Sequence, residues 1–316
     1  MQGQGSDPVL APDRRPSPFS RARRALIPNP KVIRAAIRLL RVIPAPVVRA
    51  FAAVAGTVAW MVQGDRRRIL LENLSHTAAD RSHAERRRLA RRTFRNFAVT
   101  AVDQFRLPSI KTEDLHSLFE IRGLEHVDAA LARGRGLVVA TMHLGAYELA
   151  AACLATRGYE IHGMVENLDP EVLEALASYR AATGVHLVNS KDGLRSAYRI
   201  LGQGHILALV ADRAVGNARG AVELPFAGGI RPIPVGPAVF AQGTGAALMT
   251  AFATPNSGKG ARYVMSFDPP LIPEGRGEAE RDRLMKCVVD RMSEMVRRYP
   301  DQWFVFQPNW ITREPS

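Results

Sequence analysis

Short apolar runs alternate with segments of helical periodicity from residue 118 onward. Runs with the length of buried strands occupy residues 119–122, 137–142, 159–165, 185–188 and 205–211. Helical patterns separate these runs at residues 124–133, 146–156, 170–184 and 192–201. Because strands that alternate with helices usually pair in parallel, the pattern predicts an α/β fold with a central, mostly parallel sheet flanked by helices.

The last hundred residues follow a different pattern. A long loop is expected after residue 211, followed by two strands at 247–253 and 262–267 that a turn at 256–260 joins. A final helix is expected at residues 280–298. These elements add two strands and one covering helix to the predicted sheet.

Two unusual helical patterns precede the α/β body. Residues 31–41 place aliphatic side chains on one helical face and arginines on another, and residues 47–62 are almost entirely apolar apart from Arg49. The second run is too short to span a bilayer comfortably, which takes about 20 apolar residues. We therefore predict N-terminal amphipathic helices that lie in a membrane interface. The alternative is that both helices simply cap the globular core.

These patterns divide the chain into three parts. Residues 1–30 are rich in proline, glycine, serine and arginine and lack a long apolar run, so we expect a disordered basic tail without a signal peptide. Residues 31–105 form the expected helical, membrane-associating region, and residues 106–316 the α/β domain. Residues 31–316 are expected to form one structural unit.

The charge balance indicates an anionic partner. The formal net charge is +13, and six arginines crowd the helix expected at 84–100. Such a charge run is usually a solvated helix face. The functional alternative is a surface that binds phosphate groups, either of lipid headgroups or of an acyl carrier's phosphopantetheine. Nucleic acid is not expected, because no aromatic-interleaved basic strand, zinc-ligand spacing or helix-turn-helix pattern accompanies the charge. Cys153 and Cys287 lie in apolar helical patterns, which is typical of reduced, packed thiols.

His143 is the strongest candidate for chemistry. It ends the apolar run 137–142, at the carboxyl edge of the predicted sheet where open α/β folds carry their sites, and Glu148 follows five residues later. On an unbroken helix that spacing would separate the two side chains by about 140°. We therefore expect His143 on the turn before the helix, where Gly145 permits it, with Glu148 orienting the imidazole as a general base requires. A histidine packed in the core is the alternative.

Arg180 is the second candidate. It continues the apolar stripe of the helix expected at 170–184, so its guanidinium would face the core and need an anion. That anion could be a buried carboxylate such as Glu166, a phosphate or a developing oxyanion. The sequence alone leaves these alternatives open.

Asp212 and Arg213 end the run 205–211 and should open onto the same sheet edge as His143. Glu223 follows in the expected long loop, where carboxylates are usually solvated. The chain has no P-loop, no dinucleotide glycine fingerprint and no Gly-x-Ser-x-Gly elbow. No metal site is expected at His143 and Glu148, because further ligands at metal spacing are missing.

Taken together, these residues resemble the bacterial lipid A biosynthesis acyltransferases and their actinobacterial relatives, the phosphatidylinositol mannoside acyltransferases. The resemblance covers roughly residues 35–312. It rests on His143-Leu-Gly-Ala-Tyr-Glu148, on Arg-Arg-Arg-Ile-Leu-Leu-Glu-Asn-Leu (66–74), on Asn167-x-x-Pro…Arg180-x-x-x-Gly184, on Ala211-Asp-Arg213, on Glu223…Phe226-Ala-Gly228 with Pro234-x-Gly-Pro237, and on Gln302-Trp…Gln307-Pro-Asn-Trp310. The His-x4-Glu pattern alone is weak, but the ordered set is specific.

The resemblance implies transfer of a fatty acyl group from a thioester donor, acyl-CoA or acyl carrier protein, to a hydroxyl of a membrane glycolipid such as a phosphatidylinositol mannoside or a lipid A-like acceptor. It implies His143 as general base with Glu148 as partner, and Arg180 at the donor. Asp212, Arg213 and Glu223 would shape the acceptor pocket. No cofactor beyond the donor is implied.

The resemblance also implies a location in the cell and binding partners. The protein would be peripheral and, we expect, monomeric, on an anionic lipid surface at the cytoplasmic face of the bacterial inner membrane. Trp60, Trp303 and Trp310 would suit a membrane-facing rim.

The chain departs from the family pattern at Ala214, where the mannoside enzymes tend to carry an acidic residue. This difference affects the expected identity of the acceptor more than the expected reaction. Two rival functions are a thioesterase-type hydrolase and a non-enzymatic basic protein that binds membrane or nucleic acid.

Overall fold

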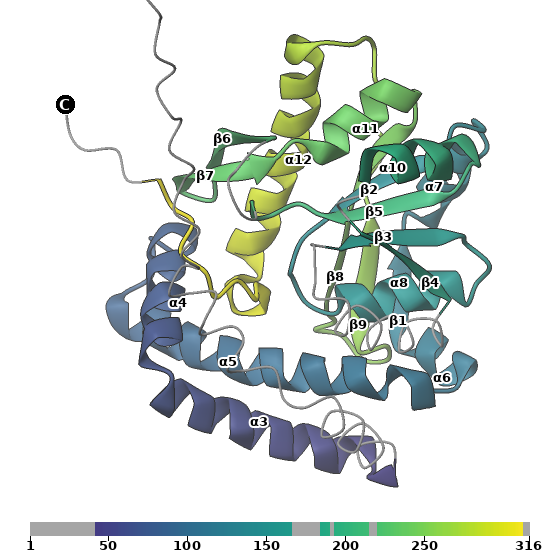
Figure 1. The fold of residues 1–316 in the computed structure, drawn as a ribbon. Coiled ribbons are helices and arrows are strands. Elements are labelled where there is room, and N and C mark those ends of the chain that lie inside the picture. Colours follow the sequence, from purple (N-terminus) through teal and green to yellow (C-terminus); the bar gives the residue numbers. More distant parts are fainter. Residues whose placement is uncertain (1–41, 166–183, 190–192, 215–219, 312–316) are drawn as a thin grey trace, which may run out of the picture.

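A seven-stranded sheet forms the centre of the molecule, which a computed structural model describes for residues 42–165, 184–189, 193–214 and 220–311 (Figure 1). The expected N-terminal tail and the helix expected at 31–41 lie outside the described residues, as does the helix expected at 170–184 apart from its last residue. The strand order is β1-β9-β8-β2-β5-β3-β4. The strands are β1 Phe119–Arg122, β2 Leu137–Thr141, β3 Ile161–Val165, β4 Val185–Asn189, β5 Ile206–Val210, β8 Ala247–Pro255 and β9 Tyr263–Phe267.

Strand pairing confirms the prediction of a mostly parallel sheet. Strands β8, β2, β5, β3 and β4 run parallel, with Leu137 opposite Ile206 on one side and Ala247 on the other. The pair β8 and β9 is antiparallel, so β9 and its parallel neighbour β1 run against the other five strands. Because β2 is central and buried on both faces, its carboxyl end lies in the middle of one sheet edge.

Helices bury both faces of the sheet. One hydrophobic cluster joins the strands to α10 Gly193–Gly202, α11 Gly236–Thr244 and α12 Glu278–Arg298. The other cluster joins them to η1 Leu107–Ser109, α6 Thr112–Ser117, α7 Leu124–Leu131 and α8 Tyr147–Ala155. The expected α/β architecture with flanking helices is therefore confirmed (Figure 1).

The N-terminal helices form an additional layer outside this core. They are α3 Ala45–Val62, α4 Gly64–Thr77 and α5 His83–Arg106. Trp60, Leu70, Leu74 and Phe94 pack between them in a third, smaller cluster that also contacts Phe306. In Figure 1 this layer runs along the lower side of the molecule, with α3 outermost.

Helix α3 has two apolar faces with different surroundings. Val48, Ala52, Gly56 and Trp60 are buried on one face. Arg49 also turns inward, where its Nε donates to Asp103 Oδ1 at 2.7 Å. The opposite face is an exposed apolar stripe, which we call the α3 stripe: Val47, Phe51, Val54, Val58 and Met61. Within the described residues α3 is the one helix long and apolar enough to cross a membrane by length and composition, and 22% of it is buried.

A hairpin occupies part of the stretch that the sequence predicted as a long loop. Strands β6 Ala221–Phe226 and β7 Gly229–Pro234 pair in an antiparallel arrangement, and α11 follows them. The two turn residues, Ala227 and Gly228, both have positive φ, at 44° and 101°. Alanine rarely adopts that conformation, so the usual Asn-Gly or Gly-Gly signal of such a turn is missing from the sequence. The loop prediction was wrong for this reason.

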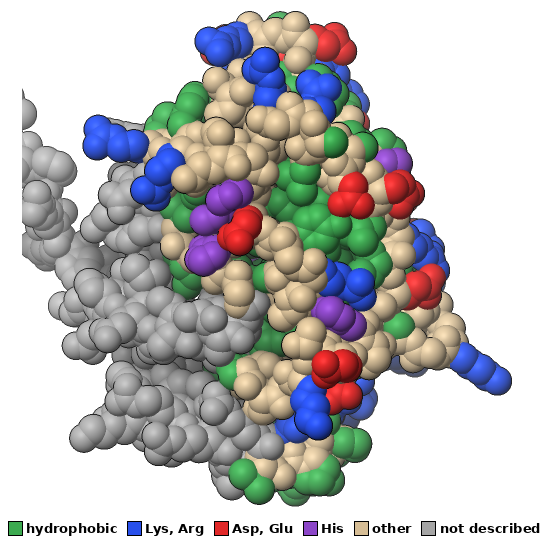
Figure 2. Space-filling view, turned by 90° about the vertical axis from the view of Figure 1, so that its right-hand side faces the viewer, with side chains coloured by type: hydrophobic (Ala, Val, Ile, Leu, Met, Phe, Trp, Pro, Cys, Tyr) green, Lys and Arg blue, Asp and Glu red, His purple; other side chains and the backbone are tan. Residues whose placement is uncertain are grey.

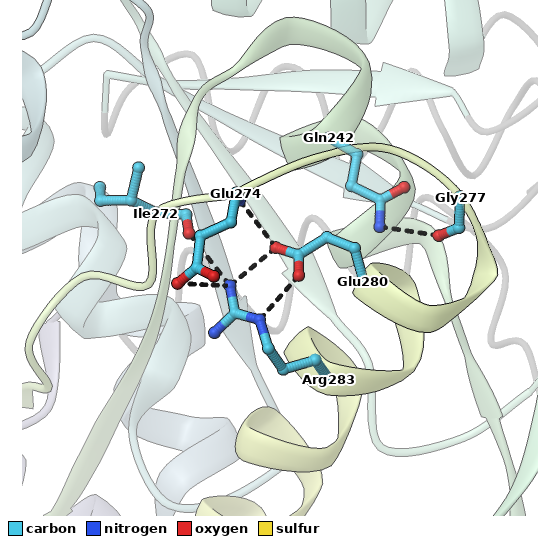
Figure 3. A network of polar contacts seen from close by, with 6 residues as sticks. All are labelled: Gln242, Ile272, Glu274, Gly277, Glu280 and Arg283. Atoms are coloured by element: carbon cyan, nitrogen blue, oxygen red, sulfur yellow. Dashed lines mark hydrogen bonds and ion pairs between the residues drawn. The ribbon is translucent and has the colours of Figure 1, made fainter.

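The start of α12 is fixed by a compact polar network (Figure 3). Arg283 donates from Nε and Nη2 to the two carboxylate oxygens of Glu280, both at 2.7 Å, and from Nη2 to the Ile272 carbonyl oxygen at 3.1 Å. The Glu274 backbone N–H donates to the same carboxylate at 2.9 Å. The hydrogen bonds from Arg283 and Glu274 lower the pKa of Glu280 to about 2. The network ties the loop after β9 to the helix that covers the sheet.

The segment after α12 connects all of these layers. It begins with η3 Pro300–Gln302 and continues to residue 311. Trp303 forms a bridge with Leu144, next to the end of β2, and the Ile311 N–H donates to the Ile230 carbonyl of β7 at 2.9 Å. Asn73 of α4 donates from Nδ2 to the Val305 carbonyl at 2.7 Å. The N-terminal layer is therefore attached to the sheet edge through this C-terminal segment.

Gly56 provides a test of how closely α3 packs on α5. A Cβ at this position would lie 2.6 Å from the Phe94 carbonyl oxygen and 2.8 Å from the Arg95 Cα, both backbone atoms that cannot rotate away. We predict that Gly56→Ala lowers the free energy of unfolding by about 1–3 kcal/mol, although alanine favours a helix more than glycine does. Urea unfolding followed by circular dichroism measures this change.

Gly64→Ala is the matched control, because Gly64 begins α4 and the nearest atom to a Cβ there is the end of the Arg67 side chain at 3.9 Å. This variant should be neutral or more stable by up to about 1 kcal/mol. Equal effects at the two glycines would contradict the close approach of α3 to α5.

Candidate active site

His143 stands on the turn between β2 and α8, as the sequence predicts. Strand β2 ends at Thr141, and α8 begins at Tyr147. Gly145 has φ +61°, and a Cβ at this position would clash with the carbonyl oxygen of Ala253. Only glycine fits such a left-handed, crowded position without strain. The turn therefore places one imidazole at the carboxyl edge of the sheet.

Backbone hydrogen bonds from the C-terminal segment hold this turn. The Phe304 N–H donates to the His143 carbonyl at 2.7 Å, and the Gly145 N–H donates to the Gln302 carbonyl at 2.9 Å. The Ala146 N–H donates to the Ala253 carbonyl of β8 at 2.9 Å. Backbone groups of His143, Gly145 and Ala146 are thus held by residues far away in the sequence.

Asp212 is the side chain that orients the ring. It follows β5, the neighbour of β2, and its Oδ1 lies 2.7 Å from His143 Nδ1. Its Oδ2 accepts from the His143 backbone N–H at 3.1 Å and from Trp303 Nε1 at 2.8 Å. The Asp212 side chain is fully buried, whereas 21% of the His143 side chain is exposed. The arrangement is a buried carboxylate behind a partly exposed imidazole.

The ionised Asp212 carboxylate selects one tautomer of the neutral His143 ring. Burial opposes ionisation, but attraction to His143 and the hydrogen bonds from His143 and Trp303 outweigh it and lower the pKa of Asp212 to about 2. An ionised carboxylate can only accept, so Nδ1 of the neutral ring carries the proton and donates it. The lone pair then lies on Nε2. This is the tautomer that a general base needs.

Glu148, which the sequence predicts as the partner of His143, lies in the first turn of α8. Its Oε1 accepts from Tyr147 Oη at 3.2 Å. The ring of Tyr147 meets the His143 ring edge-on, with centroids 5.8 Å apart. The carboxylate that contacts Nδ1 is therefore Asp212 rather than Glu148, because strand pairing brings the residue after β5 directly behind the end of β2.

The remaining predicted site residues fall in different places. Arg213 donates from Nη1 to Gln307 Oε1 at 2.5 Å and so contacts the C-terminal segment. Glu223 occupies an exposed position of β6, in the hairpin rather than in a loop. Glu166 and Arg180 lie outside the described residues. The structure thus brings together His143 and Asp212 from the predicted set.

Arg231 is a buried cation that the sequence did not single out. Its side chain is fully enclosed, and within the described residues none of its three guanidinium nitrogens makes a hydrogen bond. Its guanidinium carbon lies 5.8 Å from the ring centroid of Phe226, 5.0 Å from that of Trp303 and 4.7 Å from that of Trp310. Aromatic faces attract a cation, and here they take the place of hydrogen-bond acceptors.

The charge of Arg231 offsets that of Asp212. Burial lowers the pKa of Arg231 to about 10, against the attraction of Asp212 and Glu72. The guanidinium therefore stays charged at neutral pH. Trp303 contacts both groups: its ring packs against Arg231, and its Nε1 donates to Asp212. A buried cation near a buried carboxylate reduces the free-energy cost of keeping Asp212 ionised.

The tryptophans correct one expectation from the sequence. Trp60 and Trp303 are buried in the core, at 8% and 1% exposure, rather than on a membrane-facing rim. Trp310 is partly buried, and its Nε1 donates to Asn73 Oδ1 at 2.7 Å. The tryptophan of the Gln302-Trp303 motif could have pointed to the site, since an indole N–H can donate to a buried carboxylate. The sequence did not show that this carboxylate is Asp212.

An apolar cavity of about 60 Å³ lies next to the turn. Thr141 and Tyr147, which flank His143 in the sequence, both line it. The other lining residues come from α7, α8 and the strands they cover, among them Val139, Ala150 and Ala251. The site thus combines an oriented imidazole with adjoining space for an apolar group.

The arginine-rich part of α5 is mainly a solvated face. Arg87, Arg88, Arg91 and Arg95 are exposed, and Arg92 pairs with Asp301 at 2.6 Å. Arg88 and Arg92 also line an open hollow of about 790 Å³ between α4, α5 and the end of α12. Five arginines line this hollow together with three carboxylates: Arg81, Arg88, Arg92, Arg297 and Arg298, with Asp80, Glu85 and Asp301.

A double-mutant cycle tests the link between Arg231 and Asp212. Arg231→Met removes the charge but keeps the bulk, and Asp212→Asn removes the carboxylate charge. We predict that Arg231→Met costs more stability when Asp212 is ionised than when it is replaced by asparagine. The two substitutions should therefore be non-additive by about 0.5–3 kcal/mol in the free energy of unfolding at pH 7. Urea unfolding of the four proteins measures this coupling.

The control cycle pairs Arg231→Met with Asp114→Asn, an exposed carboxylate on α6. These two changes should add within about 0.5 kcal/mol. Additivity in both cycles would mean that Arg231 does not stabilise the buried carboxylate.

Comparisons with known proteins agree with the geometry. The sequence model of the family described as bacterial lipid A biosynthesis acyltransferase matches residues 21–312. A phosphatidylinositol mannoside acyltransferase of Mycobacterium tuberculosis is 30% identical over 214 residues, which cover 66% of this chain and 65% of that protein, just under two thirds of its length. The protein of the same name from Mycolicibacterium smegmatis is 27% identical over 229 residues, 71% of this chain and 72% of that protein.

The family match covers nearly the whole chain and includes the His143 turn, Asp212 and the C-terminal segment that holds them. The chain therefore belongs to the bacterial lipid A biosynthesis acyltransferase family.

Proposed function

We propose that this protein is an acyltransferase that moves a fatty acyl group from a thioester donor to a hydroxyl group of a membrane glycolipid. The observation that carries the proposal is the His143–Asp212 pair, a base on a partly exposed ring at a sheet edge, in a chain that belongs to an acyltransferase family. The apolar cavity beside the turn adds a place where part of an acyl chain could lie.

The proposed reaction needs one base and an activated donor. Nε2 of His143 takes the proton of the acceptor hydroxyl while the oxygen attacks the thioester carbonyl carbon. The tetrahedral intermediate collapses, the carbon–sulfur bond breaks, and the thiolate takes the proton from the imidazolium. Asp212 stabilises the transient imidazolium through Nδ1. The thioester is already activated, so no acyl-enzyme intermediate is required.

The substrates are proposed from the family and the relatives. Both named relatives are phosphatidylinositol mannoside acyltransferases, which supports an acceptor of that class, with a lipid A-like acceptor as the alternative. For the donor we propose acyl-CoA or acyl carrier protein, and for Arg180 stabilisation of negative charge at the donor. Glu148, Arg213 and Glu223 are proposed to contact substrates.

The α3 stripe supports binding to a membrane surface. Five apolar side chains are exposed along one side of α3, and the bottom edge of the molecule, where α3 lies in Figure 1, is accordingly rich in hydrophobic side chains in Figure 2. Arg49 is already paired with Asp103, so the charge within this helix does not oppose contact with lipid. A membrane glycolipid acceptor requires the enzyme to reach a bilayer. We place the protein peripherally on the cytoplasmic face of the bacterial inner membrane.

Replacement of either member of the pair tests the mechanism. We predict that His143→Ala lowers kcat/KM for transfer of a radiolabelled acyl group by about 10³-fold or more, because the base is lost. Asp212→Asn should lower it by about 10²–10⁴-fold, because the uncharged side chain no longer fixes the tautomer. The assay uses labelled palmitoyl-CoA with phosphatidylinositol mannosides, and thin-layer chromatography separates the products.

His83→Ala and Asp114→Asn are matched controls, since both residues are exposed on α5 and α6, away from the turn. Transfer by His143→Ala at the wild-type rate would show that the base is assigned wrongly. Free fatty acid as the main product, with or without acceptor, would favour the thioesterase-type hydrolase. No turnover with any donor would favour a binding protein.

Charges placed on the α3 stripe test membrane binding. We predict that Phe51→Asp with Val58→Asp weakens binding to liposomes containing anionic lipid by more than about tenfold, because burial of each such side chain in the bilayer contributes roughly 1.5–3 kcal/mol. Co-sedimentation with sucrose-loaded vesicles measures the bound fraction. Leu194→Asp is the control, because Leu194 is an exposed leucine of α10, a helix that lies well away from α3 (Figure 1). Unchanged sedimentation of the double variant would exclude the α3 stripe as the lipid contact.

A further inference from the structure

Three histidines and a glutamate gather on one face of the sheet, away from the catalytic turn. Glu160 and His205 directly precede β3 and β5, and His162 and His186 are the second residues of β3 and β4. These positions lie at the amino ends of the strands, whereas His143 follows the carboxyl end of β2. Figure 2 shows histidine side chains gathered around an acidic side chain on the surface.

Strand register explains why the four side chains meet. His162 is opposite His186 in the pair of β3 with β4. Ile161 is opposite Ile206 in the pair of β3 with β5, so Glu160 is level with His205. Side chains alternate between the two faces of a strand, so these four point away from the face that buries Ile161 and Ile206. The topology thus collects four potential ligands on three adjacent strands.

The distances fit the coordination of one metal ion. Ligand atoms of Glu160, His162 and His205 all lie within 4.8 Å of one another. His162 Nε2 and His205 Nδ1 are 3.2 Å apart. Two nitrogens bound at 2.0–2.1 Å to a tetrahedral zinc ion are separated by about 3.3 Å. The separation of these two nitrogens is therefore close to that of two ligands of one ion.

His186 lies beside these three residues but outside the group whose ligand atoms lie within 4.8 Å of one another, so its side chain would have to rotate to reach the same ion. Its Nε2 lies 3.5 Å from Glu160 Oε2, and its ring stacks on that of His162 with centroids 4.9 Å apart. Both His186 and Glu160 have 58% of their side chains exposed, so an ion can enter from solution. Arg199 of α10 adds positive charge near His162, and the Glu160 carboxylate offsets it.

We propose that His162, His205 and Glu160, with His186 as the fourth ligand, bind one divalent transition-metal ion of the zinc class. Imidazole nitrogens with one carboxylate oxygen are a donor set that zinc favours. Because β4 is the edge strand of the sheet, the ion would fasten this edge to β3 and β5. The site is separate from acyl transfer and takes no part in the proposed reaction.

Isothermal titration calorimetry with zinc chloride tests the site. The full chain is purified with a histidine-free tag and treated with EDTA, and we predict binding of one zinc ion per chain. His162→Ala and His205→Ala should each weaken binding by more than about tenfold, since loss of even a hydrogen-bond partner of a ligand costs a metal site about 10–100-fold in affinity. His83→Ala, which removes an exposed histidine from α5, should leave binding unchanged. Zinc should also slow hydrogen exchange of the β4 amides in the wild type.

His205→Asn is the second variant, because it retains a polar side chain if His205→Ala does not fold; circular dichroism reports folding. The expected result is weaker zinc binding in every folded variant of the cluster together with protected β4 amides. Absence of stoichiometric binding at micromolar zinc would overturn the proposal. Binding that both histidine substitutions leave intact would also overturn it, since the ion would then bind elsewhere.

Discussion

The buried carboxylate of Asp212 is the constraint on which the rest of the site depends. A carboxylate without water must be fully hydrogen-bonded and balanced by charge, or it will not stay ionised. Asp212 accepts from the His143 ring, the His143 backbone and the Trp303 indole, and Arg231 lies behind Trp303. These partners come from the β2 turn, the C-terminal segment and the hairpin. The tautomer of His143 therefore depends on three parts of the chain that are far apart in sequence, because all three are needed to keep Asp212 ionised.

The C-terminal segment also links the His143 turn to the surface that we propose to meet the membrane. Asn73 of α4 holds the Val305 carbonyl and the Trp310 indole, and Asn96 of α5 holds the Asp301 carbonyl at 3.1 Å. Because α3 packs on α5, the α3 stripe and His143 belong to one rigid arrangement of elements. If the α3 stripe contacts lipid as proposed, this arrangement would hold the His143 ring in a fixed orientation relative to the bilayer. These contacts explain the asparagine of the Glu-Asn-Leu motif in α4, because Asn73 binds the C-terminal segment through both ends of its amide.

Features set by local sequence periodicity, such as the strands and the His143 turn, were predicted from the sequence. The contact between His143 and Asp212 was not, because it depends on the order of the strands in the sheet. The parallel strands and the position of His143 followed from apolar runs and from Gly145, whose φ of +61° confirms the turn. The hairpin was missed because Ala227, rather than glycine or asparagine, adopts a positive φ. The sequence placed Asp212 at the same sheet edge as His143 but named Glu148, five residues away, as the carboxylate that orients the imidazole. Asp212 is 69 residues from His143 and reaches the ring because β5 lies beside β2.

This difference between the two carboxylates affects how Glu148 can act. An imidazole has one Nδ1, and Asp212 already accepts its proton from a fully buried position. Glu148 is half-buried in the first turn of α8, beside a tyrosine hydroxyl that donates to it. Two carboxylates in such unlike surroundings usually have different tasks. In the acyl transfer proposed for this chain, we therefore propose that Glu148 contacts a substrate instead of accepting the Nδ1 proton.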